Sequence, residues 1–112
     1  IGTYLKALAA HDNKIPFYAA LPVSTIDWEI DNGLGSINIE NRSSEEVSHI
    51  SGLNENGDIN KIRVIPKNTR CINPSFDVTP SRLITGIKTE KGLCKANKDS
   101  LKSLYMNWVL YV

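Results

Sequence analysis

The first 22 residues, IGTYLKALAAHDNKIPFYAALP, place an alanine-rich segment directly ahead of a short apolar run bounded by two prolines. The alanines favour a helix, and Pro16 prevents that helix from continuing. The run between Pro16 and Pro22 predicts a strand buried on both faces, as in a parallel sheet. A helix followed by such a strand is half of an α/β repeat, so we expect an α/β fold. One face of the predicted helix carries its apolar side chains: Ile1, Tyr4, Leu5 and Leu8.

The composition is that of a chain with a packed core. Of the 112 residues, 41% are hydrophobic and 22% are charged, which argues against global disorder. The formal net charge of +1 lacks the basic excess of nucleic-acid-binding proteins, so we expect no nucleic-acid partner. No apolar run approaches the roughly 20 residues that cross a bilayer, and no secretory leader is visible. We therefore expect no membrane partner and a cytoplasmic location.

The middle of the chain predicts a β-hairpin over residues 47–66. Asn56-Gly57 is a strong turn signal, and the segment KIRVIP after it alternates apolar and basic side chains. This hairpin is more polar than the first predicted strand, so we place it at a sheet edge or on the surface. Ahead of it, the sequence predicts a turn cluster and then a capped helical turn, at residues 31–35 and 43–46.

The last third again has the pattern of an α/β domain. A short extended run, SFDV at residues 75–78, leads into a predicted helix between Thr79 and Gly92. Thr79 is expected to be the N-cap of this helix, with Pro80 in the first turn and Gly92 as the stop. A final helix is predicted from Ser100 onward, with aromatic side chains at helical spacing: Tyr105, Trp108 and Tyr111.

Few residues have the spacing of catalytic or metal-binding groups. His11 and His49 are isolated, and we interpret both as surface or capping histidines. The chain lacks His-x-x-x-His, Cys-x-x-Cys and glycine-rich phosphate motifs, so we expect no metal site and no cofactor. Cys71 and Cys94 are interpreted as reduced thiols. Two neighbouring lysines would lower the pKa of the Cys94 thiol, although an ordinary thiol is the favoured interpretation.

Two polar pairs follow predicted extended runs. Asp27 and Trp28 come after the first strand, at the carboxyl edge where ligands of α/β sheets bind. Asn73 and Asp77 have a similar place ahead of the predicted helix. Two interpretations are open for this second pair: the side chains satisfy backbone groups of the loop, or they line a site. Neither pair by itself indicates a reaction.

The segments IGTYLKALAAHDNKIPFYAALPVSTIDWEI and NPSFDVTPSRLITGIKTEKG resemble those of methylthioribose-1-phosphate isomerases. These enzymes belong to a larger family with the ribose-1,5-bisphosphate isomerases and the regulatory subunits of eukaryotic initiation factor 2B. The resemblance extends from residue 1 to about residue 96 and includes the hairpin sequence SSEEVSHISGLNENGDINKIRV. The sequences IDWEI and FDVTPSRLITG are more similar to those of the isomerases than to those of the translation factor.

The resemblance implies a protein of two domains, a helical N-terminal domain and a Rossmann-like α/β domain, with the active site between them. Residues 1–112 would then be the C-terminal part of the Rossmann-like domain, a partial three-layer fold with a mostly parallel sheet and an added β-hairpin. The implied activity is conversion of 5-methylthioribose 1-phosphate to 5-methylthioribulose 1-phosphate in methionine salvage. This is an aldose–ketose isomerisation, in which hydrogen moves from C2 to C1.

The family's recognised functional residues are expected to lie outside this chain. The resemblance implies catalysis by one cysteine and one aspartate, with arginines and an Asn-Lys pair on the substrate, and it places all of these ahead of IGTYLKALAA. Cys71, Cys94, Asp27 and Asp77 do not match the catalytic positions. The resemblance therefore assigns no catalytic, substrate-binding or metal-binding residue here, and we expect a chain that is inactive alone.

The chain departs from the family pattern in two places. The family's IPIEER stands here as INIENR, with Asn38 and Asn41 at the altered positions, and the end SLYMNWVLYV differs from the family's polar tail. The alternatives to an isomerase fragment are a binding or assembly module of a split isomerase and a regulatory protein like the initiation factor 2B subunits. We expect a homo-oligomer such as a dimer, or a complex with a separately encoded N-terminal half, because open sheet edges and apolar patches favour association.

Overall fold

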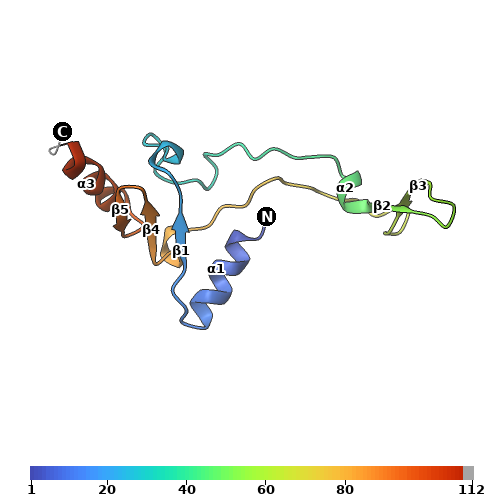
Figure 1. Cartoon of the computed structure of the whole chain (residues 1–112), viewed down its shortest axis with the longest axis horizontal. Coiled ribbons are helices and arrows are strands. Elements are labelled where there is room, and N and C mark those ends of the chain that lie inside the picture. Colours follow the sequence, from blue (N-terminus) through green and yellow to red (C-terminus); the bar gives the residue numbers. More distant parts are fainter. Residues whose placement is uncertain (110–112) are drawn as a thin grey trace. The chain divides into compact units, whose positions relative to one another are not determined.

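The computed structural model describes residues 1–109, and the side chains through Met106. The chain forms two compact units. The hairpin unit comprises Ile1 and Ile39–Phe76, and the α/β unit comprises Gly2–Asn38 together with the chain from Asp77 onward. Figure 1 labels the helices and strands of both units.

The α/β unit is built on a three-stranded sheet in the order β1-β4-β5. β1 (Tyr18–Ala20) pairs in parallel with β4 (Gly86–Thr89), and β4 pairs in antiparallel with β5 (Gly92–Cys94). Helix α1 (Thr3–Asp12) precedes β1, and helix α3 (Lys98–Val109) follows β5. The α/β class and the parallel pairing of the first strand are confirmed, and β5 adds an antiparallel strand to this sheet.

Helix α1 is confirmed, but its large apolar side chains are not the ones that it buries. Ala7 is the buried residue of α1, and the helix contacts the 3₁₀ turn Ser81–Leu83. Leu5 and Tyr4, from the predicted apolar face, are 71% and 39% exposed. A small side chain at the contact allows the turn to approach the helix axis closely, and it leaves the larger side chains of the helix free for another surface.

The prediction of a helix between Thr79 and Gly92 is wrong. A single 3₁₀ turn, Ser81–Leu83, replaces its start, and the chain then forms β4 and β5. Pro80 has extended backbone angles, φ −68° and ψ 142°, so it does not begin a helix, and the buried Thr79 hydroxyl has no hydrogen-bond partner among the described residues. β-Branched side chains favour a strand between residues 84 and 89, at Ile84, Thr85, Ile87 and Thr89.

The predicted burial of the first strand on both faces is also wrong for the described chain. β1 spans three residues, and Tyr18 at its start is 51% exposed. The cause is its position, because β1 is an end strand of the sheet and pairs on one side with β4. Ala7 and Leu83 are the buried hydrophobic residues of the part of the chain that the structure describes.

The hairpin unit confirms the predicted β-hairpin. β2 (His49–Leu53) and β3 (Ile59–Arg63) are antiparallel. The Asn54 side-chain oxygen accepts hydrogen bonds from the backbone N–H groups of Asn56 and Asp58, both at 2.9 Å. Gly57 has a φ of 86°, a left-handed conformation in which glycine has no Cβ to strain. The predicted surface position is also confirmed, because every residue of β3 is exposed.

The helical turn and the final helix that the sequence predicts are both present. The helical turn predicted at residues 43–46 is α2 (Glu45–Ser48), and residues 75–78 form a connecting segment rather than a strand. Helix α3 begins at Lys98, two residues ahead of the predicted start, because Asn97 accepts a hydrogen bond from the Ser100 N–H at 2.8 Å. The Trp108 side chain and Tyr111 lie outside the described residues.

Among residues 1–109, no helix has both the length and the apolar character needed to span a membrane.

Gly86 provides a test of the sheet, because a Cβ built on it would lie 2.9 Å from the Cys94 carbonyl oxygen. We expect Gly86→Ala to lower the free energy of unfolding by about 1–3 kcal/mol, since backbone must shift to relieve the contact. Urea titration followed by tryptophan fluorescence measures this change. Lys88→Ala, in the same strand but with an exposed side chain, is the control and should change stability by less than about 0.5 kcal/mol. Equal effects of the two variants would contradict the close contact.

Candidate functional site

One edge of the α/β unit's sheet collects the carboxyl ends of β1 and β4, because these strands are parallel. Helix α1 runs opposite to β1, so its first turn lies towards the same edge (Figure 1). Ligands of α/β sheets bind at edges of this kind. Acidic side chains gather in the segments that reach this edge: Asp27, Asp77 and Glu90.

Asp77 caps helix α1 from 73 residues further along the chain. Its Oδ2 accepts hydrogen bonds from the backbone N–H groups of Gly2, at 2.8 Å, and Tyr4, at 3.1 Å. These two bonds, the Gly2 bond first, hold the pKa of the Asp77 carboxyl below its usual range. The structure therefore favours the interpretation that Asp77 satisfies backbone groups, although they belong to α1 rather than to its own loop.

Glu90 makes the equivalent connection at the end of β4. Its Oε2 accepts a hydrogen bond from the Val23 N–H at 2.9 Å, at the start of the 3₁₀ turn Val23–Thr25 that follows β1. This bond lowers the pKa of the Glu90 carboxyl. The carboxylate thus ties together the two chain segments that leave the parallel strands.

Asp27 and Trp28 lie beside a small cavity of about 130 Å³. The Asp27 carboxylate accepts a hydrogen bond from the Glu29 N–H at 2.9 Å, so it closes its own turn. The Trp28 ring lies against the Tyr105 ring of α3, with 5.7 Å between the centroids. Asp31, which forms an ion pair with Lys98, also lines this cavity, and the hydrogen bond from Lys98 lowers the Asp31 pKa. These contacts hold α3 on the α/β unit.

Asn73 belongs to the hairpin unit, whereas Asp77 belongs to the α/β unit. The Nδ2 atom of Asn73 donates hydrogen bonds to the Ser43 carbonyl oxygen, at 3.0 Å, and to Glu46 Oε2, at 2.8 Å. Asn73 therefore satisfies polar groups of its own unit, which is the first of the two interpretations left open for it.

The isolated histidines and cysteines do not form a reactive cluster in the described chain. His11 is exposed, and His49 Nδ1 lies 2.8 Å from the Ser48 hydroxyl. Cys71 and Cys94 are free thiols, as predicted. Burial raises the pKa of the Cys94 thiol, which agrees with the favoured interpretation of an ordinary thiol and not with the alternative that its neighbouring lysines lower the pKa. Among the described residues, no group of three or more His, Cys, Asp or Glu side chains is placed to hold a metal ion.

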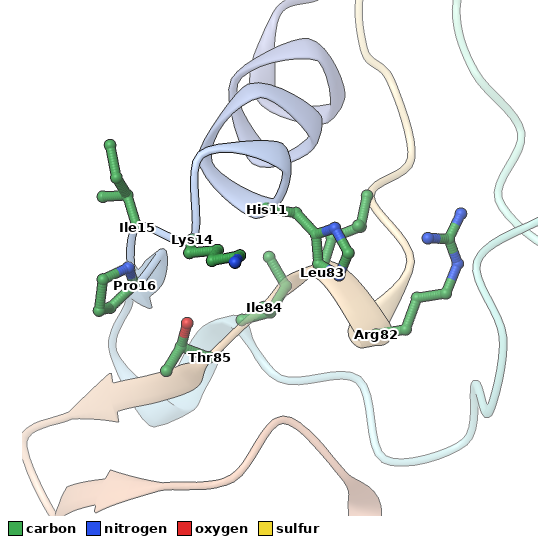
Figure 2. A pocket seen from close by; sticks show the side chains of 8 residues that line it. All are labelled: His11, Lys14, Ile15, Pro16, Arg82, Leu83, Ile84 and Thr85. Atoms are coloured by element: carbon green, nitrogen blue, oxygen red, sulfur yellow. The ribbon is translucent and has the colours of Figure 1, made fainter.

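A larger cavity, of about 360 Å³, lies at the other end of α1. One wall is formed by His11, Lys14, Ile15 and Pro16, and the other by residues 82–85 ahead of β4. In Figure 2 the His11 ring and the Lys14 side chain extend over the same hollow, whereas the Arg82 guanidinium points away from it. Basic groups therefore stand beside apolar walls in this cavity, and no carboxylate lines it.

Residues 1–96 match the Initiation factor 2 subunit family. The chain belongs to this family. Among its curated relatives, the methylthioribose-1-phosphate isomerases of Gluconobacter oxydans and Escherichia coli are each 54% identical over 105 residues, which is 94% of the chain. The chain spans about 28% of the length of these relatives.

Two solved structures resemble the chain along almost its whole length. The 5-methylthioribose 1-phosphate isomerase of Pyrococcus horikoshii is 41% identical, with a TM-score of 0.75 over 96% of the chain and 27% of that protein. The delta subunit of translation initiation factor eIF-2B from A. fulgidus is 31% identical, with a TM-score of 0.77 over 95% of the chain and 28% of that protein. The resemblance inferred from the sequence is confirmed at the level of the family.

Sequence reasoning missed the role of Glu90 and the left-handed backbone of Lys14, which has a φ of 56°. Nothing local marks Glu90, because its partner Val23 lies 67 residues away. No glycine between Asp12 and Pro16 marks Lys14 as the left-handed residue, and Asn13 is the residue type of that segment that adopts this conformation more often.

The Asp77 cap makes α1 sensitive to acid. Because the folded-state pKa of Asp77 is lowered, its stabilising effect is complete above the unfolded-state pKa of about 4 and is lost as the pH falls through the lower folded-state value. We expect the Gly2 and Tyr4 amide proton shifts to titrate together below pH 4, as measured by NMR. Asp77→Asn should remove this titration, and Asp99→Asn, in the first turn of α3, is the control that should not.

Proposed function

We propose that the chain is the C-terminal part of the Rossmann-like domain of a methylthioribose-1-phosphate isomerase, with residues 1–112 all belonging to that domain. The observation that carries the proposal is the 54% identity to curated isomerases over 94% of the chain. The helical N-terminal domain and the first part of the α/β domain would come from the remaining length of such relatives. We place this isomerase in the cytoplasm.

The proposed reaction converts 5-methylthioribose 1-phosphate to 5-methylthioribulose 1-phosphate. Hydrogen moves from C2 to C1, so the substrate and product have the same atoms and no oxidant or reductant is consumed. Such a transfer needs an acid/base group beside C1 and C2 and cationic groups on the phosphate. We assign none of these roles to the present residues, and the chain is proposed to support the site through the position of α1 and the carboxyl edge of the sheet.

The open surfaces of the α/β unit support this role. β1 pairs on one side only, so its other edge can receive a strand. Leu5 on α1 is 71% exposed, and Tyr18 on β1 is 51% exposed. Large apolar side chains at these places are accounted for if the missing part of the domain packs on them.

A second candidate is a regulatory subunit like those of initiation factor 2B, which would bind partners without catalysis. The TM-score of 0.77 to the A. fulgidus delta subunit favours it as much as the 0.75 to the P. horikoshii isomerase favours the first proposal. Sequence identity favours the isomerase proposal, because the chain is 41% identical to the isomerase and 31% identical to the delta subunit. The isomerase is therefore the leading proposal.

The first test is activity of the isolated chain. We expect no turnover of 5-methylthioribose 1-phosphate by the 112 residues alone, since loss of one acid/base group costs about 10²–10⁴ in rate and the proposal assigns no such group to these residues. Turnover that disappears on mutation of Cys94 or Asp77 would overturn the proposal. Addition of a separately expressed N-terminal segment of the Gluconobacter oxydans isomerase, which ends where the matched region begins, should restore turnover.

The second test is association. Exposed apolar pairs stand opposite each other in the hairpin, with Ile50 and Ile62 at 61% and 60% exposed. We expect oligomers at tens of micromolar, because surface of this kind is uncommon on monomers and two-fold dimers are the commonest closed assembly. Light scattering coupled to size exclusion measures the mass, and a single monodisperse species of 12.4 kDa would contradict association. Truncation after Ser103 shows whether the end of α3 promotes the association or limits it.

A further inference from the structure

The cavity of Figure 2 lies within the α/β unit, between the end of α1 and the segment that leads into β4. Its volume of about 360 Å³ is in the range of small-molecule sites. It is at the opposite end of α1 from the Asp77 cap, so the two features do not share residues.

Lys14 occupies a backbone position that suits glycine better than lysine. Its N–H donates to the His11 carbonyl oxygen at 3.1 Å, and the Ile15 N–H donates to the Ala10 carbonyl oxygen at 2.8 Å. This is the pair of bonds that closes a Schellman motif, whose extra residue is usually glycine. Lys14 has a φ of 56°, and it is the non-glycine residue with positive φ in the described chain. A residue that breaks a local preference in this way often has a functional reason.

The basic groups at the cavity have no partners within the part of the chain that the structure describes. Lys14 and Arg82 form no ion pair there, and His11 forms no side-chain hydrogen bond. The His11 and Ala10 carbonyl oxygens accept the two Schellman bonds, and the Lys14 ammonium makes no hydrogen bond to either of them in the described chain. The Thr85 hydroxyl oxygen accepts a hydrogen bond from the Phe17 N–H at 2.9 Å, which leaves its own proton to donate.

The remaining lining is apolar. Ile15 and Pro16 form one side, and Leu83, which is buried, and Ile84 form the other. The cavity therefore offers one charged corner and a hydrophobic wall. A ligand that fits this lining carries its negative charge at one end and a small hydrocarbon group at the other.

We propose that this cavity binds an oxyanion attached to a small apolar group, with Lys14 as the principal charge contact. His11 and the Thr85 hydroxyl contribute hydrogen-bond donors, and residues 83 and 84 contact the apolar group. A phosphate ester and a carboxylate share this chemistry, and the experiment distinguishes them.

The test uses the full 112-residue chain, titrated with isobutyl phosphate and with isovalerate and followed by amide NMR shifts. We expect saturable shifts around His11, Lys14 and Thr85. Tighter binding of isobutyl phosphate assigns a phosphate ester, and tighter binding of isovalerate assigns a carboxylate. If neither ligand gives saturable shifts at these residues, the proposal is wrong.

The Lys14→Gly variant distinguishes an effect on ligand binding from an effect on the stability of the fold. Glycine relieves the left-handed backbone, so the variant should unfold at an equal or higher urea concentration, yet it should bind the ligand at least tenfold more weakly. Lys14→Asn, which also tolerates this conformation, should behave in the same way. Lys6→Ala removes the same charge from α1 outside the cavity and should leave binding unchanged. Equal weakening by Lys6→Ala and Lys14→Gly, or unchanged binding in Lys14→Gly, would overturn the proposal.

Discussion

The parallel pairing of β1 with β4 is the constraint on which the rest of the α/β unit depends. It joins segments about 68 residues apart, and the flanking residues lock it: the Phe17 N–H donates to Thr85 Oγ1 at 2.9 Å, and the Thr85 N–H donates to the Phe17 carbonyl oxygen at 2.7 Å. Gly86 lies opposite Tyr18 in this pairing, and a Cβ built on it would lie 3.3 Å from Tyr18 Cδ1 and 2.9 Å from the Cys94 carbonyl oxygen of β5. Once the strands are paired, both the carboxyl edge and the cavity at the other end of α1 are determined.

Charge is distributed along α1 in the sense that its dipole favours. A carboxylate, Asp77, stands at its first turn, and His11 and Lys14 stand at its end. The Asp77 carboxylate stabilises the helix through the partial positive charge of its N-terminus, and the Lys14 ammonium has the sign that the partial negative charge of the C-terminus favours. The N-terminal charge comes from a distant segment, so the cap also fixes where the chain before β4 lies. The helix end, by contrast, is closed by its own backbone, which leaves the Lys14 side chain available.

The sequence contained enough information for the local elements and too little for the long-range ones. The hairpin around Asn56-Gly57 and the helix before Pro16 follow from residues close in the chain, and both were predicted correctly. The segment after Pro80 was assigned to a helix because Leu83, Ile84 and Ile87 have helical spacing. Its β-branched residues favour a strand equally well, and β1, far away in the sequence, decides between them. The Asp77 and Glu90 contacts escaped prediction for the same reason, since their partners are 67 or more residues distant.

The pattern of exposure agrees with the proposal that this chain is part of a larger domain. The buried hydrophobic residues of the described chain are Ala7 and Leu83, which is a small core for two units. Residues such as Leu5, Tyr18 and Leu93 lie on ordered elements yet remain largely exposed, at 71%, 51% and 59%. Ordering a residue costs conformational entropy that burial of apolar surface normally offsets. An exposed apolar side chain held on a helix or strand gains little in return, so these positions are understandable as contacts to a surface beyond this chain. The relatives, more than three times as long, have chain enough to provide that surface.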